Sequence, residues 1–308
     1  MKVTIIGGAG RVGSTAAYAL QLGGVVNEIA LVDVAADVAG GEALDLRHGA
    51  SLSASQKFSG GGYECAEGSD IIIVTAGLRR KPDESRLQLI NRNVSLFKNI
   101  MGEVAKLKLP ENWILFVVAN PVDILTRLGK EMLGLPANRA IGLGTVLDSS
   151  RFRSLIADHF NINPTQVDAL ILGEHGDSMI PVWSSANVNG TPLACMPGFS
   201  EDWTKEIFDF TKKSGAEVIR LKGGAGYAVG LSIKIVTEAI ALDKKSVLPI
   251  SSYQTGALGI SDVCLSIPTI VGKNGAEQVL TPKLTETETA GLQNSAKVLK
   301  DIYEQIEK

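Results

Sequence analysis

The chain has 308 residues, of which 45% are hydrophobic and 20% are charged, and its formal net charge at neutral pH is -3. A chain of this length and composition can bury one large core or two medium ones, and it does not have the composition of a disordered protein. The slight negative charge argues against a general nucleic-acid or anionic-membrane surface, so we expect a small-molecule partner.

The three cysteines, Cys65, Cys195 and Cys264, are scattered along the chain and have no metal-binding spacing. This usage is typical of a reducing compartment and predicts no metal site. The first apolar run is too short for a signal peptide, and no run approaches the ~20 residues that span a bilayer. We therefore expect a cytoplasmic protein that binds neither membranes nor nucleic acid.

A glycine-rich turn follows the first predicted strand. Residues 3–6 predict a buried strand and residues 14–20 a helix. Between them, Gly8, Gly10 and Gly13 supply the spacing G-x-G-x-x-G. In a strand-turn-helix unit these glycines allow a tight turn, the approach of a diphosphate to the backbone, and close packing of helix on strand. The diphosphate would lie at the helix N-terminus, where free N–H groups favour anions.

An acidic residue follows the second predicted strand. Residues 28–32 form this strand, and Asp33 comes directly after it, about 20 residues beyond Gly13. An acid here accepts hydrogen bonds from the adenosine ribose hydroxyls and repels a 2′-phosphate. The unit therefore predicts NAD rather than NADP. The alternative is a strand-end acid that only caps the next turn.

A basic loop follows the next buried strand. Residues 37–50 predict a helix, residues 59–62 a loop, and residues 70–74 a buried strand. Residues 75–86 then bring together four cationic side chains, a glycine and a proline. Because strand ends form the ligand edge of an open α/β sheet, we interpret this loop as a lid over an anionic substrate. A solvated basic loop is the alternative.

The most apolar segment of the chain, residues 113–119, predicts a central buried strand, and a long helix is predicted before it, from about residue 84 to 108. The strand is followed by Asn120, whose amide offers both a donor and an acceptor to a substrate hydroxyl or a cofactor. A helix at about 122–133 and a strand at 140–143 then complete the first domain.

The second half of the chain carries the candidate proton donor. Residues 147–153 predict the beginning of a helix on which Asp148 and Arg151 share a face. The apolar strand 169–172 then opens into a Gly-Glu-His-Gly-Asp segment, in which His175 is placed as a catalytic imidazole would be.

These patterns predict an α/β protein in two domains. Residues 1–144 would form a doubly wound parallel Rossmann sheet that binds NAD, and residues 145–308 an α+β domain that binds substrate and carries out catalysis. Near the C-terminus, a helix is predicted by apolar residues at helical spacing and by the capping box Thr285-x-x-Glu288. We assign this helix to packing alone.

Taken together, the motifs resemble the family of NAD-dependent L-lactate and L-malate dehydrogenases, and the match runs through most of the chain. The motifs that carry this resemblance are Gly8-x-Gly10-x-x-Gly13, Asp33, Thr75-Ala76-Gly77, Arg86, Asn120-Pro121-Val122-Asp123, Leu147-Asp148-Ser149-x-Arg151-Phe152 and Gly173-Glu174-His175-Gly176-Asp177.

The resemblance implies a catalytic set of His175, Asp148 and Arg86. His175 would exchange a proton with the substrate, Asp148 would orient the imidazole ring, and Arg86 would polarise the reacting carbonyl. Arg151 would hold the substrate's C1 carboxylate bidentately, and Asn120 would help to position substrate and cofactor. The implied NAD-binding residues are Gly8, Gly10, Arg11, Val12, Gly13, Asp33, Thr75, Ala76, Gly77, Asn93, Val118 and Asn120.

The lid also bears on which acid is the substrate. In the family, the residue six positions before the lid arginine faces the variable group of the substrate, and glutamine there is typical of lactate enzymes and arginine of malate enzymes. In this chain that residue is Arg80, which resembles the malate type. Oxaloacetate would pair Arg80 with a second carboxylate, whereas pyruvate would leave it desolvated and alone. We therefore expect reversible conversion of L-malate to oxaloacetate, unless Arg79 or Lys81 faces the substrate instead.

Other lid features resemble lactate enzymes as much as malate enzymes. Asp83 replaces a glycine that is usual in this lid, and residues 87–94 fit either type. The combination resembles the lactate-like branch of malate dehydrogenases, which implies a homo-oligomer, with a tetramer favoured over a dimer. Asp168 stands where enzymes regulated by fructose bisphosphate carry a histidine, so we expect no such regulation.

Two other functions remain as alternatives. The first is an L-lactate dehydrogenase or a broad 2-hydroxyacid dehydrogenase. The second is a non-catalytic module that binds NAD. The presence of His175, Asp148, Arg151 and Arg86 argues against such a module, because binding alone needs no proton donor.

Overall fold

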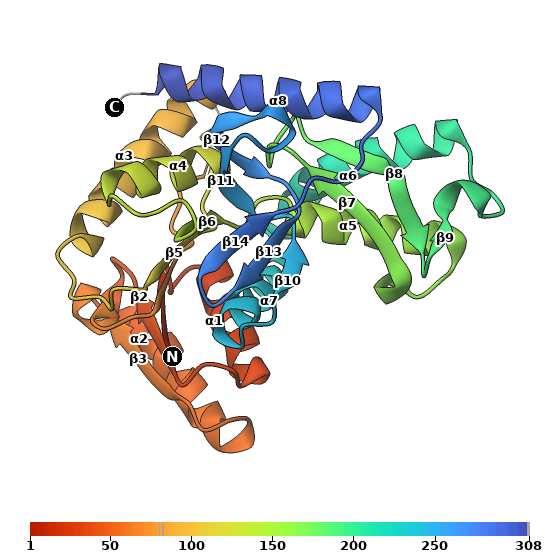
Figure 1. Ribbon diagram of the computed structural model, residues 1–308. Coiled ribbons are helices and arrows are strands. Elements are labelled where there is room, and N and C mark those ends of the chain that lie inside the picture. The colour runs from red at the N-terminus through yellow and green to blue at the C-terminus, as the bar shows by residue number, and fades with distance from the viewer. Residues whose placement is uncertain (80, 82, 307–308) are drawn as a thin grey trace.

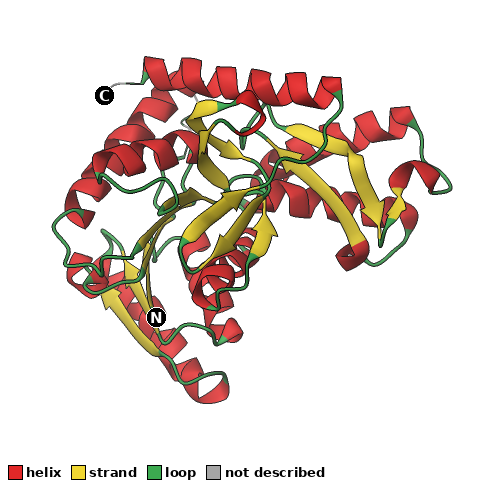
Figure 2. Cartoon of the chain, in the orientation of Figure 1, coloured by secondary structure: helices red, strands yellow, loops and turns green. Residues whose placement is uncertain are grey.

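The computed structural model describes residues 1–79, 81 and 83–306. A large twisted sheet with helices on both faces occupies the centre of the molecule, and a smaller unit of helices and strands lies beside it (Figure 1). Figure 2 shows the same layers by type of structure. None of the helices in the described part of the chain is long and apolar enough to cross a membrane.

The large sheet has eight strands within the described residues. Their spatial order is β12 (Ser261–Ser266), β11 (Ser251–Thr255), β6 (Ala140–Gly142), β5 (Ile114–Val117), β4 (Ile71–Val74), β1 (Lys2–Ile6), β2 (Glu28–Val32) and β3 (Lys57–Gly61). The six strands from β3 to β6 are parallel, in the doubly wound Rossmann order. The predicted fold class is confirmed. Two further strands extend this sheet: β11 pairs in the antiparallel direction with β6, through Ser251 and Gly142, and β12 pairs in the antiparallel direction with β11.

Helices cover the two faces of the sheet in two groups. On one face lie α1 (Arg11–Gly23), α2 (Ala36–Gly49) and α7 (Tyr227–Ala241), and on the other lie α3 (Arg86–Val104), α4 (Val122–Met132) and α8 (Glu286–Gln305). β4 shows why both groups are needed. Ile71 and Ile73 point into the first core, while Ile72 and Val74 point into the second, and all four are fully buried. A strand buried on both faces is apolar at every position.

The remaining elements build the smaller unit and a second small sheet. They are α5 (Val146–Phe160), α6 (Glu201–Lys222), the antiparallel strands β7 (Val167–Leu172), β8 (Ile180–Val188) and β9 (Thr191–Pro192), and the strands β10 (Ser246–Leu248), β13 (Thr269–Gly272) and β14 (Gly275–Val279). A third core joins α5, α6 and β7 through Phe152, Trp203 and Ile171. This core fixes α5 against β7, the two elements that lead into the predicted catalytic residues.

One loop prediction was wrong. Residues 59–62 were predicted as a loop, but Ser59, Gly60 and Gly61 lie in β3 and pair in parallel with β2. A Cβ on Gly60 would lie 2.2 Å from the carbonyl oxygen of Ala39 in α2. The glycine therefore allows α2 to pack closely on the strand, and it does not mark a turn.

The helix predicted from about residue 84 to 108 is shorter than expected, since α3 runs from Arg86 to Val104. Its start is set by a capping box: the Ser85 hydroxyl accepts from the N–H of Gln88, and the Gln88 side chain accepts from the N–H of Ser85. The box places Arg86 at the first helical position. The loop that was predicted to be a lid therefore ends where α3 begins, and Arg86 is a residue of that helix.

Candidate active site

The glycine-rich turn is anchored on β2 and has no room for side chains. The N–H groups of Gly7 and Gly8 donate to the Val32 carbonyl at 2.8 and 3.0 Å. A Cβ on Gly13 would lie 2.2 Å from the Gly7 carbonyl oxygen, and one on Gly8 would lie 2.7 Å from Cβ of Leu31. These positions accept only glycine, and the resulting bare backbone fits a dinucleotide diphosphate.

The first turn of α1 provides the anion-binding end of this cradle. Gly10 is the N-cap and contributes no side-chain hydrogen bond, so N–H groups of the first turn are left for a phosphate. Val12 packs against the apolar core. Arg11 is exposed, and its Nη1 donates to the carbonyls of Lys222 at 2.6 Å and Gly224 at 2.8 Å. Arg11 therefore links the glycine-rich turn to the junction between α6 and α7 by hydrogen bonds. No local sequence pattern predicts this contact.

Asp33 lies at the end of β2 beside the glycine turn. Its Oδ2 accepts from the N–H of Ala9 and its Oδ1 from the N–H of Ala35, both at 3.1 Å. The carboxylate thus caps the following turn, as the simpler interpretation holds. Each oxygen has a second lone pair, which leaves the group able to accept from ribose hydroxyls as well.

The end of β4 is held by side chains of its own motif. The Thr75 hydroxyl donates to the Ile6 carbonyl at 3.0 Å, and the N–H of Ala76 donates to the same carbonyl at 3.2 Å. Asn93, only 4% exposed, accepts from the N–H of Leu78 at 2.7 Å. Asn93 therefore fixes the first residues of the lid instead of facing solvent. Gly77 is exposed between these anchored positions.

At the end of β5, Val118 is half-buried and packs against the core, while Asn120 is exposed. The peptide bond between Asn120 and Pro121 is cis, and α4 begins at the next residue. The Asn120 amide therefore lies at the carboxyl edge of the parallel sheet, next to the strand that precedes the lid.

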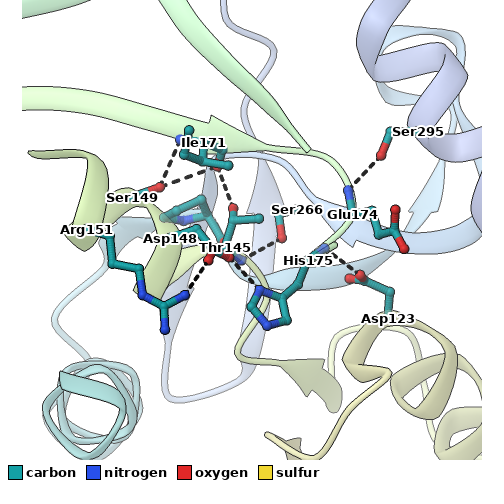
Figure 3. Close-up of polar contacts among 11 residues, drawn as sticks. Asp123, Thr145, Asp148, Ser149, Arg151, Ile171, Glu174, His175, Ser266 and Ser295 are labelled. Atoms are coloured by element: carbon teal, nitrogen blue, oxygen red, sulfur yellow. Dashed lines mark hydrogen bonds and ion pairs between the residues drawn. The ribbon is translucent and has the colours of Figure 1, made fainter. Parts of the chain in front are cut away.

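His175, Asp148 and Arg151 come together although they belong to different elements (Figure 3). The imidazole Nδ1 lies 2.5 Å from Oδ2 of Asp148, and Nη1 of Arg151 donates to the other oxygen, Oδ1, at 3.0 Å. Asp148 is 1% exposed, whereas the side chains of His175 and Arg151 are 21% and 18% exposed. Because Asp148 occupies Nδ1, the second ring nitrogen, Nε2, is the one left for a substrate.

The electrostatics of this cluster favour a charged pair. Burial disfavours both the imidazolium and the carboxylate. For His175, the attraction of the Asp148 carboxylate is larger than the effect of burial, so the pKa of the imidazole is raised. His175 and Arg151 in turn hold the pKa of Asp148 below its usual value in spite of burial. The cluster can therefore carry a proton on the imidazole and keep the adjacent carboxylate ionised.

The register of α5 against β7 fixes Asp148. The Thr145 hydroxyl donates to the Ile171 carbonyl at 2.5 Å, and the Ser149 hydroxyl accepts from the N–H of Ile171 at 3.0 Å. Both contacts are buried. The hydroxyls on either side of Asp148 in sequence thus hold the first turn of the helix in place.

Two further side chains hold the loop that carries His175. Oδ2 of Asp123, in the first turn of α4, accepts from the N–H of His175 at 2.8 Å. The Ser295 hydroxyl of α8 accepts from the N–H of Glu174 at 2.7 Å. Sequence reasoning gave these residues no role. Asp123 was visible in the Asn-Pro-Val-Asp motif, whereas Ser295 lies far along the chain and gives no local signal.

Arg86 contacts the acidic side chains of the same loop. Its Nη2 donates to Oε1 of Glu174 at 3.0 Å, its Nη1 pairs with Asp177, and the side chain is 53% exposed. Arg86 thus pairs with the two acidic residues of the Gly-Glu-His-Gly-Asp segment, one on each side of the histidine. Arg80, on which the malate prediction depends, lies outside the described residues.

Helix α6 packs over the side chain of Arg151. A Cβ on Gly215 would lie 3.5 Å from both terminal nitrogens of Arg151, so the helix backbone passes directly over the guanidinium. The sequence analysis did not predict this helix. The described residues hold no group of three or more histidine, cysteine or acidic side chains that could bind a metal ion.

A dinucleotide cradle, an imidazole backed by a buried carboxylate, and an arginine clamp define an NAD-dependent 2-hydroxyacid dehydrogenase. Residues 1–142 match the family model described as lactate/malate dehydrogenase, NAD binding domain, and residues 145–308 match the one described as lactate/malate dehydrogenase, alpha/beta C-terminal domain. The chain belongs to the lactate/malate dehydrogenase family.

Individual relatives cover almost the whole chain. It is 42% identical to the L-lactate dehydrogenase of Acetivibrio thermocellus, with 99% of this chain and 97% of that protein aligned. It is 44% identical to L-lactate dehydrogenase 1 of Clostridium acetobutylicum, over 99% and 98%. The crystal structure of the minor L-lactate dehydrogenase from Enterococcus mundtii matches with a TM-score of 0.94 at 36% identity, covering 99% of this chain and 98% of that one.

The comparisons confirm the family resemblance and NAD as the cofactor. They do not support the expectation of malate specificity, because these relatives are named L-lactate dehydrogenases. The interpretation that was held as an alternative is therefore the better supported one.

Proposed function

We propose that the chain is an L-lactate dehydrogenase, which interconverts L-lactate and pyruvate. The observation that carries a 2-hydroxyacid substrate is the cluster of His175, Asp148 and Arg151, and the names of the relatives favour lactate among such acids. The roles below are our assignments to these residues.

When bound by the glycine-rich turn of Gly8, Gly10 and Gly13, NAD would supply the hydride acceptor for C2 of the hydroxy acid. His175 Nε2 takes the hydroxyl proton, so that lactate loses one hydride and one proton and becomes pyruvate. Asp148 holds the ring by Nδ1 and stabilises the imidazolium that forms. Arg151 binds the C1 carboxylate with its guanidinium nitrogens, which orients C2 toward both partners. In the reverse direction His175 returns the proton to the oxygen of pyruvate.

Arg86 acts on the reacting oxygen in this proposal. A guanidinium next to a carbonyl stabilises the negative charge that develops during hydride transfer to it. In the structure its two terminal nitrogens, Nη1 and Nη2, are engaged by Asp177 and Glu174. The N–H groups that these acids do not use are the ones left for the oxygen of the substrate.

Malate is the second candidate, and Arg80 is the observation that favours it. A second substrate carboxylate would pair this arginine, whereas pyruvate would leave it unpaired if it is buried on closure. An unpaired buried charge costs about 3 to 5 kcal/mol, which corresponds to roughly a hundred- to several-thousand-fold discrimination. Pyruvate turnover therefore requires a lid that keeps Arg80 in solvent.

The initial rate of NADH oxidation with pyruvate and with oxaloacetate, at matched concentrations, tests both candidates. A preference for pyruvate supports the lactate assignment, and a preference for oxaloacetate overturns it in favour of malate. Arg80→Gln then reports the role of the lid: if Arg80 faces the substrate, the ratio of kcat/KM for the two acids moves toward pyruvate by roughly a hundredfold or more. Lys81→Gln tests the alternative, because it removes the same charge from the neighbouring exposed position. A larger shift there than in Arg80→Gln would assign the role to Lys81.

A further inference from the structure

Asp123 is a buried carboxyl group that the proposed proton transfer does not use. It is 2% exposed, and it lies in the first turn of α4 immediately after the Asn-Pro-Val segment that leaves β5. Its Oδ2 accepts from the N–H of His175 at 2.8 Å. Its Oδ1 is buried without a hydrogen bond of ordinary geometry to any described residue.

His175 is therefore flanked by two buried carboxyl groups of different kinds. Asp148 meets the imidazole ring, and Asp123 meets the backbone of the same residue (Figure 3). The hydrogen bond from the N–H of His175 to Asp123 also fixes the orientation in which the loop holds the imidazole ring. A carboxylate in this place can act on the imidazolium by its charge as well as by its hydrogen bond.

The surroundings of Asp123 make its charge conditional. Burial raises its pKa to about 7, and the negative charge of Glu174 acts in the same direction. The Ser251 hydroxyl of β11, the N–H of His175 and the charge of His175 oppose this rise. Cys264 of β12 is the other titratable neighbour, and burial raises the pKa of its thiol, which stays neutral. Asp123 is therefore ionised most readily when His175 carries a proton.

We propose that Asp123 is a positioning residue of the proton-transfer step, which holds the backbone of His175 and adds a second negative charge that stabilises the imidazolium. This inference rests on the proposed role of His175 in proton exchange. On this proposal, the proton affinity of the imidazole depends on two carboxylates: Asp148, which contacts the ring, and Asp123, which accepts from the backbone N–H of His175.

The variant Asp123→Asn separates charge from shape. The amide oxygen of asparagine can still accept from the N–H of His175, but the negative charge is gone. We expect the pKa of His175 to fall by about one unit, which lowers its protonated fraction roughly tenfold above that pKa. In pyruvate reduction, which needs the protonated ring, the falling limb of kcat/KM moves to lower pH by the same amount.

The direct measurement is an NMR titration of the His175 imidazole, assigned by loss of its resonance in His175→Asn. Asp158→Asn is the matched control, because it makes the same chemical change at an exposed position of α5. A lower His175 pKa in Asp123→Asn alone supports the inference, and an unchanged titration overturns it. This readout needs no turnover, so it stays interpretable even if neither pyruvate nor oxaloacetate is a substrate.

Two further measurements keep the inference testable if Asp123→Asn does not fold. In the unmodified chain, the His175 resonance should shift in two steps, because a coupled neighbour titrates in the same range. A single-step curve would contradict coupling to Asp123. In Asp123→Ser, the hydroxyl can replace the acceptor but not the charge. Wild-type pH dependence in that variant would reduce Asp123 to a structural role.

Discussion

In the proposed reaction, the pH dependence follows the protonation of the His175 imidazole. Because Asp148 outweighs burial, the pKa of His175 lies above its ordinary value of 6.5. In the proposed reaction, pyruvate reduction needs the imidazolium, so we expect its kcat/KM to be highest at low pH and to fall as the pH rises through the raised pKa. Lactate oxidation would need the neutral ring, so its kcat/KM should rise over the same pH range. Profiles measured in both directions should therefore show opposite limbs with a common pKa.

The variant His175→Asn tests whether these limbs belong to that residue. Loss of a general acid-base group lowers turnover by ~10²–10⁴-fold, and the residual rate should lose the common limb. Binding of NADH, followed by its fluorescence, should be unchanged, because no cofactor contact is assigned to His175. A variant that retained the wild-type pH profile would assign the proton to another group.

Two glycine-to-alanine substitutions are expected to have different effects on cofactor affinity and stability. In the glycine-rich turn, Gly13→Ala places a methyl group 2.2 Å from the Gly7 carbonyl oxygen, so the turn must open and the affinity for NADH should fall at least tenfold. In α2, Gly41→Ala meets nothing within 4 Å and should stabilise the fold by about 0.5 to 1 kcal/mol. NADH titration and thermal unfolding of both variants measure the difference. Equal effects on NADH affinity would mean that the cradle is elsewhere.

Elements with strong local patterns were predictable from the sequence. The buried strands, the glycine turn and the capping box of α8 each depend on neighbouring residues, and the structure has all of them. Helix α6 was not predicted, because most of its surface is exposed and only Trp203 and Thr211 are buried along its 22 residues. β3 was missed because its glycines resemble a turn, whereas Gly60 in fact allows close packing on Ala39 of the preceding helix, α2. Local signals cannot reveal such partners.

The same distinction applies within the site. His175, Asp148 and Arg151 could be selected from their motifs, and the structure joins them by hydrogen bonds. Asn93 also holds the backbone at Leu78, which its position in the sequence did not indicate, and its assignment to the cofactor stays a prediction. The pairing of Arg86 with the acids of the histidine motif spans 88 residues or more and could not be read from spacing.

One face of the whole molecule carries exposed apolar side chains on two adjacent helices. Tyr18 and Leu22 of α1 are 55% and 62% exposed, and Leu231 and Ile235 of α7 are 56% and 46% exposed. Apolar groups gathered in this way favour contact with another protein surface. We propose that a second copy of the chain covers this face, consistent with the expected homo-oligomer, in which a tetramer is favoured and a dimer is the alternative.

Analytical ultracentrifugation measures this directly, since one chain has a mass of 32.5 kDa. We expect a species of several times that mass, and Leu231→Asp should shift it toward smaller species because a carboxylate would be buried at the contact. Met132→Asp is the control, at an exposed apolar residue of α4 that lies over the opposite face of the sheet. A monomeric wild-type chain would rule out the proposed contact.

The large sheet contains strands from both halves of the chain, so the order of synthesis affects how it assembles. β6 obtains its outer neighbour only when β11 is made, because Gly142 pairs with Ser251. These residues are roughly 110 positions apart, and synthesis at ~5–20 residues per second separates them by about 5 to 20 s. During that interval the nascent chain presents an open strand edge, on which a neighbouring chain can pair. Slower translation lengthens the exposure, so the yield of correctly assembled protein should depend on the speed of the ribosome and on the spacing of chains along one message.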